Sequence, residues 1–351
     1  MQIGIVGTGR MGTAIVRRLL ECDHDVQVWN CTVDNARDAR EAGARRAPTL
    51  KELVNDSEVV ISLLRDNLTV ARVYLGANGL LSGRVEGRHF IDMSTVSPET
   101  HWPIAPVMTF RNAGFIECPV SGSIPAALSG TLVGFAAGDA LEFAHVQPLL
   151  EQLCNRVEHV GPLGAGARMN LAANLLLAMF WQALGEALLL VDPLPIDTAH
   201  AIDLLADSSI GAMILRRRGP QVVAAMNGDA SDASAYDVDA MLKGLRYVAQ
   251  EATTRGNSLP LASRALECFD RVSREGGGRV ESAAYPAYWI ALEKAVANGG
   301  LRPKTSEPER GHDMSQGAFN RSRRGGYAAG AAAEMADVQA LRLERGEAPA
   351  S

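Results

Sequence analysis

The feature that most restricts the fold is a glycine-rich turn between an apolar run and a stretch with helical periodicity. Residues 2–6 (QIGIV) are apolar and lead directly into residues 7–12 (GTGRMG). Residues 13–22 carry apolar side chains at helical spacing, and a second short apolar run follows at 26–29. A G-x-G-x-x-G turn inside a strand–helix–strand unit of about this length predicts a dinucleotide-binding βαβ motif.

Each glycine of the turn has its own physical role in such a motif. The first allows a tight turn, the second lets the backbone approach a pyrophosphate, and the third lets the helix pack closely on the strand. The pyrophosphate then lies at the positive end of the helix. We therefore expect the turn residues to bind the cofactor: Gly7, Thr8, Gly9, Arg10, Met11 and Gly12.

Further apolar runs recur at the intervals of a parallel sheet. They lie at residues 58–63, 89–93, 114–118, 131–137 and 157–160, with a helical segment at 49–55. This alternation predicts an α/β fold whose N-terminal Rossmann domain contains a doubly wound parallel sheet. Ligands of such sheets bind beyond the carboxyl ends of the strands. The loops after Val6, Leu63 and Met93, and Leu64 with them, are therefore expected beside the cofactor.

The end of the second strand bears on the choice of cofactor. An NAD-specific site usually presents an acidic residue to the ribose hydroxyls at this point. Here Asn30 stands there, Cys31 and Thr32 follow, and the nearest cation for a 2′-phosphate is Arg37. The missing acid favours NADP, with NAD as the alternative, while a solvated helix position is an equally good interpretation of Arg37.

The second half of the sequence has a helical pattern. A long helix is predicted from Asn170 to Val191, followed by an all-α C-terminal domain with helices at 198–205, 212–218, 238–254, 260–275 and 283–298 and a break at 276–278. Residues 171–191 have the length of a membrane span. They contain polar residues, including Glu186, that are costly near a bilayer centre, so we expect a helix buried between protein layers.

These patterns divide the chain into three segments. Residues 1–163 are predicted to form the dinucleotide-binding domain, and residues 164–299 a helical domain for substrate binding and dimerisation. Residues 300–351 are predicted to be a tail. Its segment 302–325 has the composition of a disordered linker, and a short helix is predicted at 328–345.

Composition excludes several classes of function. The formal net charge of −6 and pI of about 5.7 give no reason to expect binding to nucleic acid or to an anionic membrane. The five cysteines are far apart and lack neighbouring histidines, which indicates free thiols and no metal site. The N-terminal residues lack the pattern of a cleavable signal, so a cytoplasmic protein is expected.

Four motifs in order resemble the β-hydroxyacid dehydrogenase family, which includes 3-hydroxyisobutyrate dehydrogenases and semialdehyde reductases, and the related imine reductases. They are residues 7–12, residues 92–98 (DMSTVSP), residues 118–123 (CPVSGS) and residues 164–174 (GAGARMNLAAN). The resemblance extends over about residues 2–295. It implies an NAD(P)-dependent oxidoreductase that transfers hydride between nicotinamide and a small carbonyl or hydroxy acid, and it implies a homodimer.

The second and third motifs suggest where the reactants lie. Ser94 and Thr95 resemble residues on the nicotinamide side of the family's site. Ser121, Gly122 and Ser123 resemble its substrate loop. Hydroxyls and backbone N–H groups can bind a small carboxylate without a dedicated cation.

Two further polar residues match the family's active site. Asn174 lies one helical turn beyond Asn170, so both side chains point from the same face of the helix. We expect Asn174 to hydrogen-bond the substrate. Lys243 matches a lysine near the family's active site, although Gly244 stands where an aspartate is usual.

The sequence departs from the family pattern at Asn170. The fourth motif aligns this position with the family's catalytic lysine, which exchanges a proton with the substrate oxygen. An amide can hydrogen-bond an oxygen but cannot titrate near neutrality. Arg168 faces elsewhere on the helix and holds its proton too tightly. Proton assistance is commonly worth roughly 10²–10⁴-fold in rate, so its loss needs an explanation.

Three interpretations follow. In one, the protein acts on a small carbonyl acid, and Asn170, Asn174 and a water or another side chain relay the proton. In another, it is an imine reductase whose iminium substrate accepts hydride without concurrent protonation. In the last, it binds the dinucleotide without catalysis.

Overall fold

The computed structural model describes residues 1–32, 36–192, 194–208, 213–229 and 236–297. The chain divides into two units, Met1–Leu301 and Arg302–Ser351. The second unit lies outside the described residues. The predicted linker at 302–325 and the predicted helix at 328–345 therefore also lie outside them.

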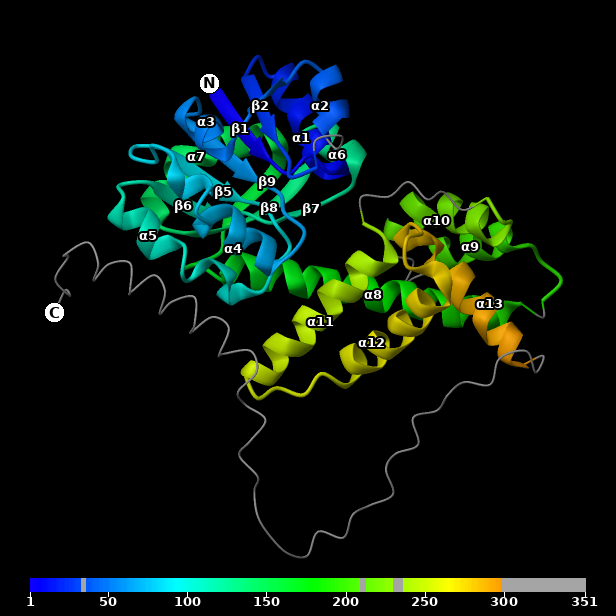
Figure 1. The fold of residues 1–351 in the computed structure, drawn as a ribbon. Helices are drawn as coiled ribbons and strands as arrows, with labels where there is room; N and C mark the ends of the chain where they lie inside the picture. Colours follow the sequence, from blue (N-terminus) through cyan, green and yellow to red (C-terminus); the bar gives the residue numbers. More distant parts are fainter. Residues whose placement is uncertain (33–35, 193, 209–212, 230–235, 298–351) are drawn as a thin grey trace, which may run out of the picture. The chain divides into compact units, whose positions relative to one another are not determined.

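Nine strands form one sheet in the described part of the chain (Figure 1), in the order β3-β2-β1-β4-β5-β6-β8-β7, with β9 paired to β8. The first six strands in this order, β3, β2, β1, β4, β5 and β6, run parallel to one another. Strand β8 is antiparallel to both β6 and β7. The predicted Rossmann fold is confirmed, and the sheet is mixed rather than wholly parallel. The strands are β1 Gln2–Val6, β2 Asp25–Trp29, β3 Arg45–Arg46, β4 Val59–Ser62, β5 His89–Asp92, β6 Gly114–Glu117, β7 Val120–Ser121, β8 Leu132–Gly138 and β9 Cys154–His159.

Helices cover both faces of this sheet because alternate strand residues point to opposite sides. Ile3 and Ile5 of β1 pack with α1 and α7 on one face, and Val6 packs with α3, α4 and α5 on the other. These strand residues are fully buried. The helices are α1 Arg10–Glu21, α2 Arg37–Glu41, α3 Leu50–Asn55, α4 Asn67–Leu75, α5 Ala105–Phe110, α6 Ile124–Leu128 and α7 Ala140–Leu153.

The predicted helical half is also confirmed. Its core contains Trp181, Phe269 and Tyr285, of which Phe269 and Tyr285 stack with ring centroids 3.8 Å apart. The helices are α8 Ala165–Val191, α9 Thr198–Asp207, α10 Met213–Met226, α11 Val238–Thr254, α12 Pro260–Val272 and α13 Tyr285–Ala297.

Two of these helices have ends that differ from the prediction. Helix α10 continues well past residue 218, through Gly219 and Pro220. Val222 in its second half is fully buried, and this burial stabilises the longer helix. Helix α12 ends at Val272, three residues early, and a π-type turn over Ser273–Gly277 follows. Gly276 in that turn has a φ of +97°, a conformation that glycine adopts readily.

Helix α8 is the one helix of the described chain that is long and apolar enough to cross a membrane. A third of its most apolar window is buried inside the structure. It packs against α11, α12 and α13 and, near its N-terminus, against β8. The helix is therefore less enclosed than the sequence suggested, and its large exposed side chains include Leu176 and Leu190.

Candidate active site

The glycine turn after β1 has the shape that the sequence predicts. Gly7 has a φ of +98°, and a Cβ atom there would lie 2.1 Å from the carbonyl oxygen of Leu63. A Cβ on Gly12 would lie 2.1 Å from the carbonyl oxygen of Gly7, so helix and turn pack too closely for any side chain. A Cβ on Gly9 would meet nothing within 4 Å. The turn thus leaves open space at the N-terminus of α1, where a pyrophosphate fits.

Asn30 is attached to this turn from the end of β2. Its Nδ2 donates to Thr8 Oγ1 at 2.8 Å, and Thr8 is buried. Cys31 and Thr32 are exposed beside it, as are Gly9 and Arg10 in the turn, while Met11 packs against the core. The guanidinium of Arg37 is 78% exposed and pairs with Glu41 at 2.8 Å. Arg37 is therefore held within its own helix, which agrees with the solvated interpretation.

Two loops at the carboxyl ends of β4 and β5 are joined by Ser94. Its Oγ accepts the backbone N–H of Leu64 at 2.8 Å and donates to Asp92 Oδ1 at 2.7 Å. Ser62, the last residue of β4, donates to the same carboxylate oxygen. The buried Asp92 therefore holds Ser94 and, through it, Leu64, two residues that the sequence predicts to lie beside the cofactor.

A buried acidic pair lies below these loops. Asp92 and Glu117 are register partners on the adjacent strands β5 and β6, and both are fully buried. His101 lies between them, with Nε2 2.7 Å from Asp92 Oδ2 and Nδ1 2.7 Å from Glu117 Oε2. Burial alone would lower the pKa of His101, but its hydrogen bonds to both carboxylates outweigh burial and raise the pKa to about 9.

The start of helix α8 brings Asn170 to the same loops. Asn170 is 2% exposed, and its Nδ2 donates to Thr95 Oγ1 at 3.3 Å. Asn174, one turn further on, is half-buried, and its side chain makes no hydrogen bond to another described residue. Arg168 is paired with Glu251 of α11 at 2.7 Å, so it is committed to joining two helices.

Lys243 of α11 reaches the same loops from the helical half. Its Nζ donates to the carbonyl oxygen of Arg65 at 2.7 Å and to that of Thr95 at 3.2 Å. Burial lowers its pKa from the usual value, and the carboxylates of Asp66 and Asp237 offset part of that shift. The structure therefore brings Lys243 and Asn170 together, because both bind Thr95.

The predicted substrate loop follows β7. Gly122 has a φ of +151°, and a Cβ there would lie 2.6 Å from a methyl group of Leu132. Ser123 occupies the N-cap position of α6, but its side chain accepts no capping hydrogen bond. Ser121 and Ser123 are both half-buried, and neither hydroxyl bonds to another described residue. Both hydroxyls are therefore available to a ligand.

The glycine turn, the Rossmann sheet and the helical half together define an NAD(P)-binding oxidoreductase fold. Residues 2–161 match the NAD binding domain of 6-phosphogluconate dehydrogenase, and residues 164–288 match the NAD-binding domain of NADP-dependent 3-hydroxyisobutyrate dehydrogenase. Glyoxylate/succinic semialdehyde reductase 1 of Arabidopsis thaliana is 30% identical over 81% of this chain and 96% of its own length. The 3-hydroxyisobutyrate dehydrogenase of Pseudomonas aeruginosa is 32% identical over 76% of this chain and 90% of its own. The chain belongs to the 3-hydroxyisobutyrate dehydrogenase (β-hydroxyacid dehydrogenase) family.

Solved structures share the fold of this chain. Psf3 in complex with NADP⁺ and 2-OPP is 26% identical, with a TM-score of 0.74 over 83% of this chain and 99% of its own. An imine reductase from Pseudomonas sp. has a TM-score of 0.53 over 82% of this chain and 98% of its own, and at 17% identity it shows a shared fold.

The cytokine-like nuclear factor N-PAC of Xenopus tropicalis is 28% identical, and this chain spans about half (53%) of its length.

Neither Glu117 of the buried acidic pair nor His101 between the two acids was predicted from the sequence. Asp92 was singled out only as the first residue of a motif. The available signal was an acidic residue at the end of each of two predicted strands. Its meaning depends on the register that makes those two residues neighbours, and strand register does not follow from a single sequence.

Proposed function

We propose that this protein transfers hydride between a nicotinamide dinucleotide and a small carbonyl or hydroxy acid, and that Lys243 exchanges the proton. The observation that carries the proposal is the convergence of Lys243 and Asn170 on Thr95. The open N-terminus of α1 supports binding of the dinucleotide, which supplies or accepts the hydride when bound. Substrate binding and proton exchange are then carried out by residues of the chain.

Lys243 has the properties that a proton donor needs. An ammonium group has three N–H bonds, and two of those of Lys243 are directed to backbone carbonyl oxygens. The third can bond a substrate oxygen, give up its proton as the carbonyl is reduced, and recover it from solvent. A pKa lowered by burial brings the group closer to the range in which proton exchange is efficient.

Asn170 and the substrate loop would orient the substrate. We infer that Asn170 takes the position of the family's catalytic lysine and hydrogen-bonds the reacting oxygen, with Asn174 one turn beyond it. The hydroxyls of Ser121 and Ser123 are free to bind a carboxylate, so the preferred substrates are short carbonyl acids.

The cofactor is proposed to be NADP. Asn30 puts no negative charge where a 2′-phosphate would lie, and its side chain already bonds Thr8. A surface hollow of about 740 Å³ beside α2 is lined by Arg37, Arg40, Arg45 and Arg46 together with Glu41. Arg37 is paired with Glu41 and Arg45 with Asp25, so the positive potential that suits a phosphate comes mainly from Arg40 and Arg46.

The test is NADPH and NADH oxidation by the purified protein, followed by absorbance against matched panels of short aldehyde or keto acids and of cyclic imines. Turnover of the carbonyl acids is the expected result. Turnover of imines alone would replace the proposal with imine reduction. No turnover on either panel, in protein that binds the cofactor, would favour a role without catalysis.

A further inference from the structure

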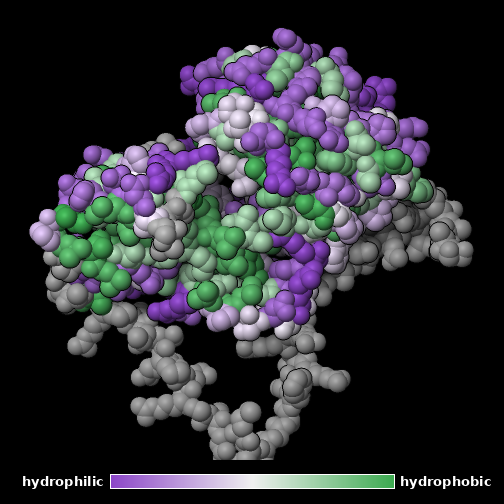
Figure 2. Space-filling model, turned by 180° about the vertical axis from the view of Figure 1, so that it is seen from behind, coloured by the Kyte–Doolittle hydropathy of each residue, from purple (hydrophilic) through white to green (hydrophobic). Residues whose placement is uncertain are grey.

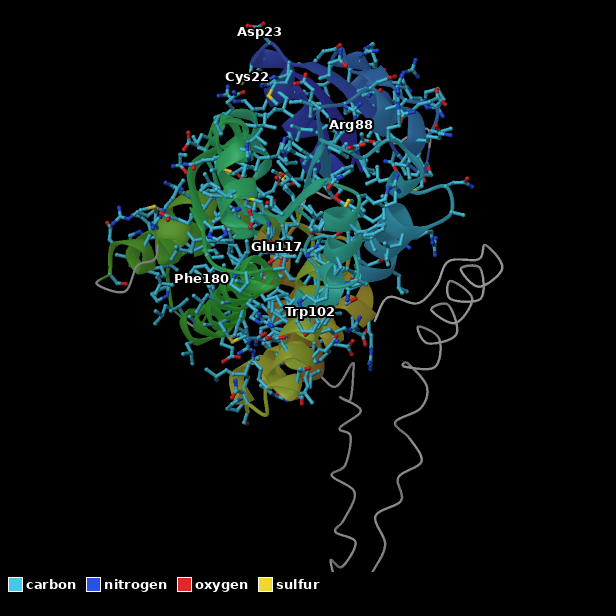
Figure 3. The ribbon with its side chains drawn as sticks, turned by 90° about the vertical axis from the view of Figure 1, so that its left-hand side faces the viewer. Cys22, Asp23, Arg88, Trp102, Glu117 and Phe180 are labelled. Atoms are coloured by element: carbon cyan, nitrogen blue, oxygen red, sulfur yellow. The ribbon has the colours of Figure 1, made fainter. Side chains whose placement is uncertain are left out.

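His101 connects two parts of the site that are otherwise held by separate carboxylates. Asp92 and Glu117 stand side by side at the ends of β5 and β6, and both are fully buried. Two ionised carboxylates on neighbouring strands, with no water around them to screen their charges, repel each other strongly. Glu117, labelled in Figure 3, is covered completely by the rest of the protein, and His101, itself 1% exposed, bonds to both acids.

The remaining oxygen of each carboxylate is directed to a different element. Glu117 Oε1 accepts backbone N–H groups of the first turn of α8, from Gly164 at 2.7 Å, Gly166 at 2.9 Å and Ala167 at 3.2 Å. Asp92 Oδ1 accepts the hydroxyl of Ser94. The imidazole therefore joins the start of α8 to the Ser94–Thr95 loop, which is expected beside the cofactor.

We propose that His101 is a positioning residue that, as a cation donating to both Asp92 and Glu117, fixes the Ser94–Thr95 loop relative to the helix that carries Asn170. The proposal rests on the proposed function for the identity of the reactants. It goes beyond that function by assigning a role to a group that contacts no reactant.

Between two ionised carboxylates, the imidazole has to be charged. A neutral imidazole has one N–H, so its other nitrogen would face a carboxylate oxygen lone pair to lone pair at 2.7 Å. An imidazolium donates at both nitrogens and balances one of the two negative charges. The N-terminus of α8 contributes further positive potential at Glu117.

No other charged group in the described structure competes for His101. Asp92 faces it from β5, and Glu117 and the ring of Phe115 face it from β6. On α4, the hydroxyl of Tyr74 bonds Ser62 behind Asp92, and burial raises the pKa of that hydroxyl, which keeps it neutral. On α8, Arg168 is paired with Glu251.

The proposal makes a directional statement about pH. The pKa of His101 rises from 6.5 to about 9 in the folded protein. A group of this kind stabilises the fold fully below its unfolded value, and the stabilisation is lost as pH rises through the folded value. The connection that His101 makes between the Ser94–Thr95 loop and α8 should therefore weaken as pH rises through about 9.

Three variants separate charge from shape. His101→Gln keeps an amide donor of similar size but has no charge, whereas His101→Lys keeps the charge and can donate to both acids. His200→Gln is the matched control, because His200 is exposed on α9. The readout is the dissociation constant of NADPH, or of NADH if the wild type binds it more tightly, measured by fluorescence from pH 6.5 to 10.

We expect His101→Gln to bind the cofactor about tenfold more weakly at pH 7, the size expected when a charged hydrogen bond is lost. We expect its affinity to lack the decline around pH 9 that the wild type and His200→Gln show. His101→Lys should restore affinity to within about threefold at pH 7. Wild-type affinity in His101→Gln would overturn the proposal, and so would equal losses in the Gln and Lys variants with the wild-type pH profile. Because the readout is binding, a protein that turns over no substrate still tests this inference separately from the proposed function.

A measurement on the wild type covers the case in which His101→Gln does not fold. The chain has seven histidines, and among the described ones His101 is the one that bonds two buried carboxylates. With ¹⁵N-labelled histidine, one ring should retain two protonated nitrogens at pH 8 and titrate near 9. Absence of any imidazolium at pH 8 would overturn the proposal.

Discussion

At the scale of single residues, the site is defined by two side chains that approach Thr95 from different helices. Asn170 comes from α8 and Lys243 from α11, and they lie 73 residues apart in the sequence. The family resemblance indicated both residues, but their meeting point depends on how α11 packs against α8. The sequence could therefore predict the two residues and not their convergence on Thr95.

Replacement of Lys243 tests its role directly. Lys243→Met should lower kcat for carbonyl reduction by about 10²-fold or more, because no group would supply the proton. Lys243→Arg is the informative comparison, since it keeps the charge and the donors to Arg65 and Thr95 but cannot release a proton. We expect it to bind cofactor within a few-fold of wild type and to remain as slow as the Met variant. A Lys243→Arg enzyme with near wild-type kcat would show that Lys243 only positions the loops.

The pH dependence of reduction should follow the same lysine. Its pKa is lowered by burial, so the protonated form is lost at a lower pH than for an exposed lysine. We expect kcat for reduction to fall as pH rises through this lowered pKa, and the fall to be absent in Lys243→Arg. Steady-state kinetics at saturating cofactor measure both profiles.

Asn170→Lys tests the inferred replacement at this position. A lysine there would add a second titratable donor beside Thr95, and carbonyl reduction should rise in kcat. Circular dichroism and cofactor binding verify that the variant is folded. A well-folded variant with no gain would count against the assignment of Asn170 to the reacting oxygen.

Cofactor choice is a residue-scale property as well. Asn30→Asp places a carboxylate where the ribose 2′ position is expected, which should repel a 2′-phosphate and accept a hydrogen bond from a 2′-hydroxyl. We expect the ratio of dissociation constants for NADH and NADPH to shift towards NADH by at least about tenfold, which is about 1.4 kcal/mol. An unchanged ratio would mean that the 2′ position lies elsewhere.

At the scale of elements, the sequence predicted long and strongly patterned segments well and short ones poorly. The glycine turn, the parallel strands and α8 follow from periodicity and glycine placement. The two-residue strands β3 and β7 have no pattern of their own, since each exists only by pairing with a longer neighbour. Helix α10 crosses Gly219 and Pro220 because tertiary burial outweighs weak local propensity.

Helix α11 offers a test of how an element holds a site residue. Its N-cap is Asp237, whose Oδ1 accepts the backbone N–H of Ala240 at 2.8 Å. Asp237→Ala should lower the free energy of unfolding by about 1 kcal/mol, whereas Asp237→Asn should keep most of the cap. Urea denaturation measures both. Equal losses in the two variants would mean that the charge of Asp237, and not its cap, stabilises the helix.

At the scale of the whole molecule, the exposed side of α8 bears on the predicted homodimer. Met169, Leu176, Ala183 and Leu190 recur at seven-residue intervals and are all exposed, with Leu176 at 72% and Leu190 at 81%. Seven residues are close to two helical turns, so these residues form one apolar stripe. Figure 2 shows apolar residues gathering over the helical half of the chain. A stripe of this kind marks an interaction surface more often than it faces water.

We predict that a second copy of the chain covers this stripe in solution. Wild-type protein should have about twice the 37.3 kDa mass of one chain by light scattering. Leu176→Glu should shift it towards the monomer, because a charge in an apolar interface is costly to bury. Leu141→Glu is the matched control, since Leu141 on α7 is equally exposed, at 75%, and lies away from the stripe. A dimer that survives Leu176→Glu would place the interface on another surface, and a monomeric wild type would overturn the predicted homodimer itself.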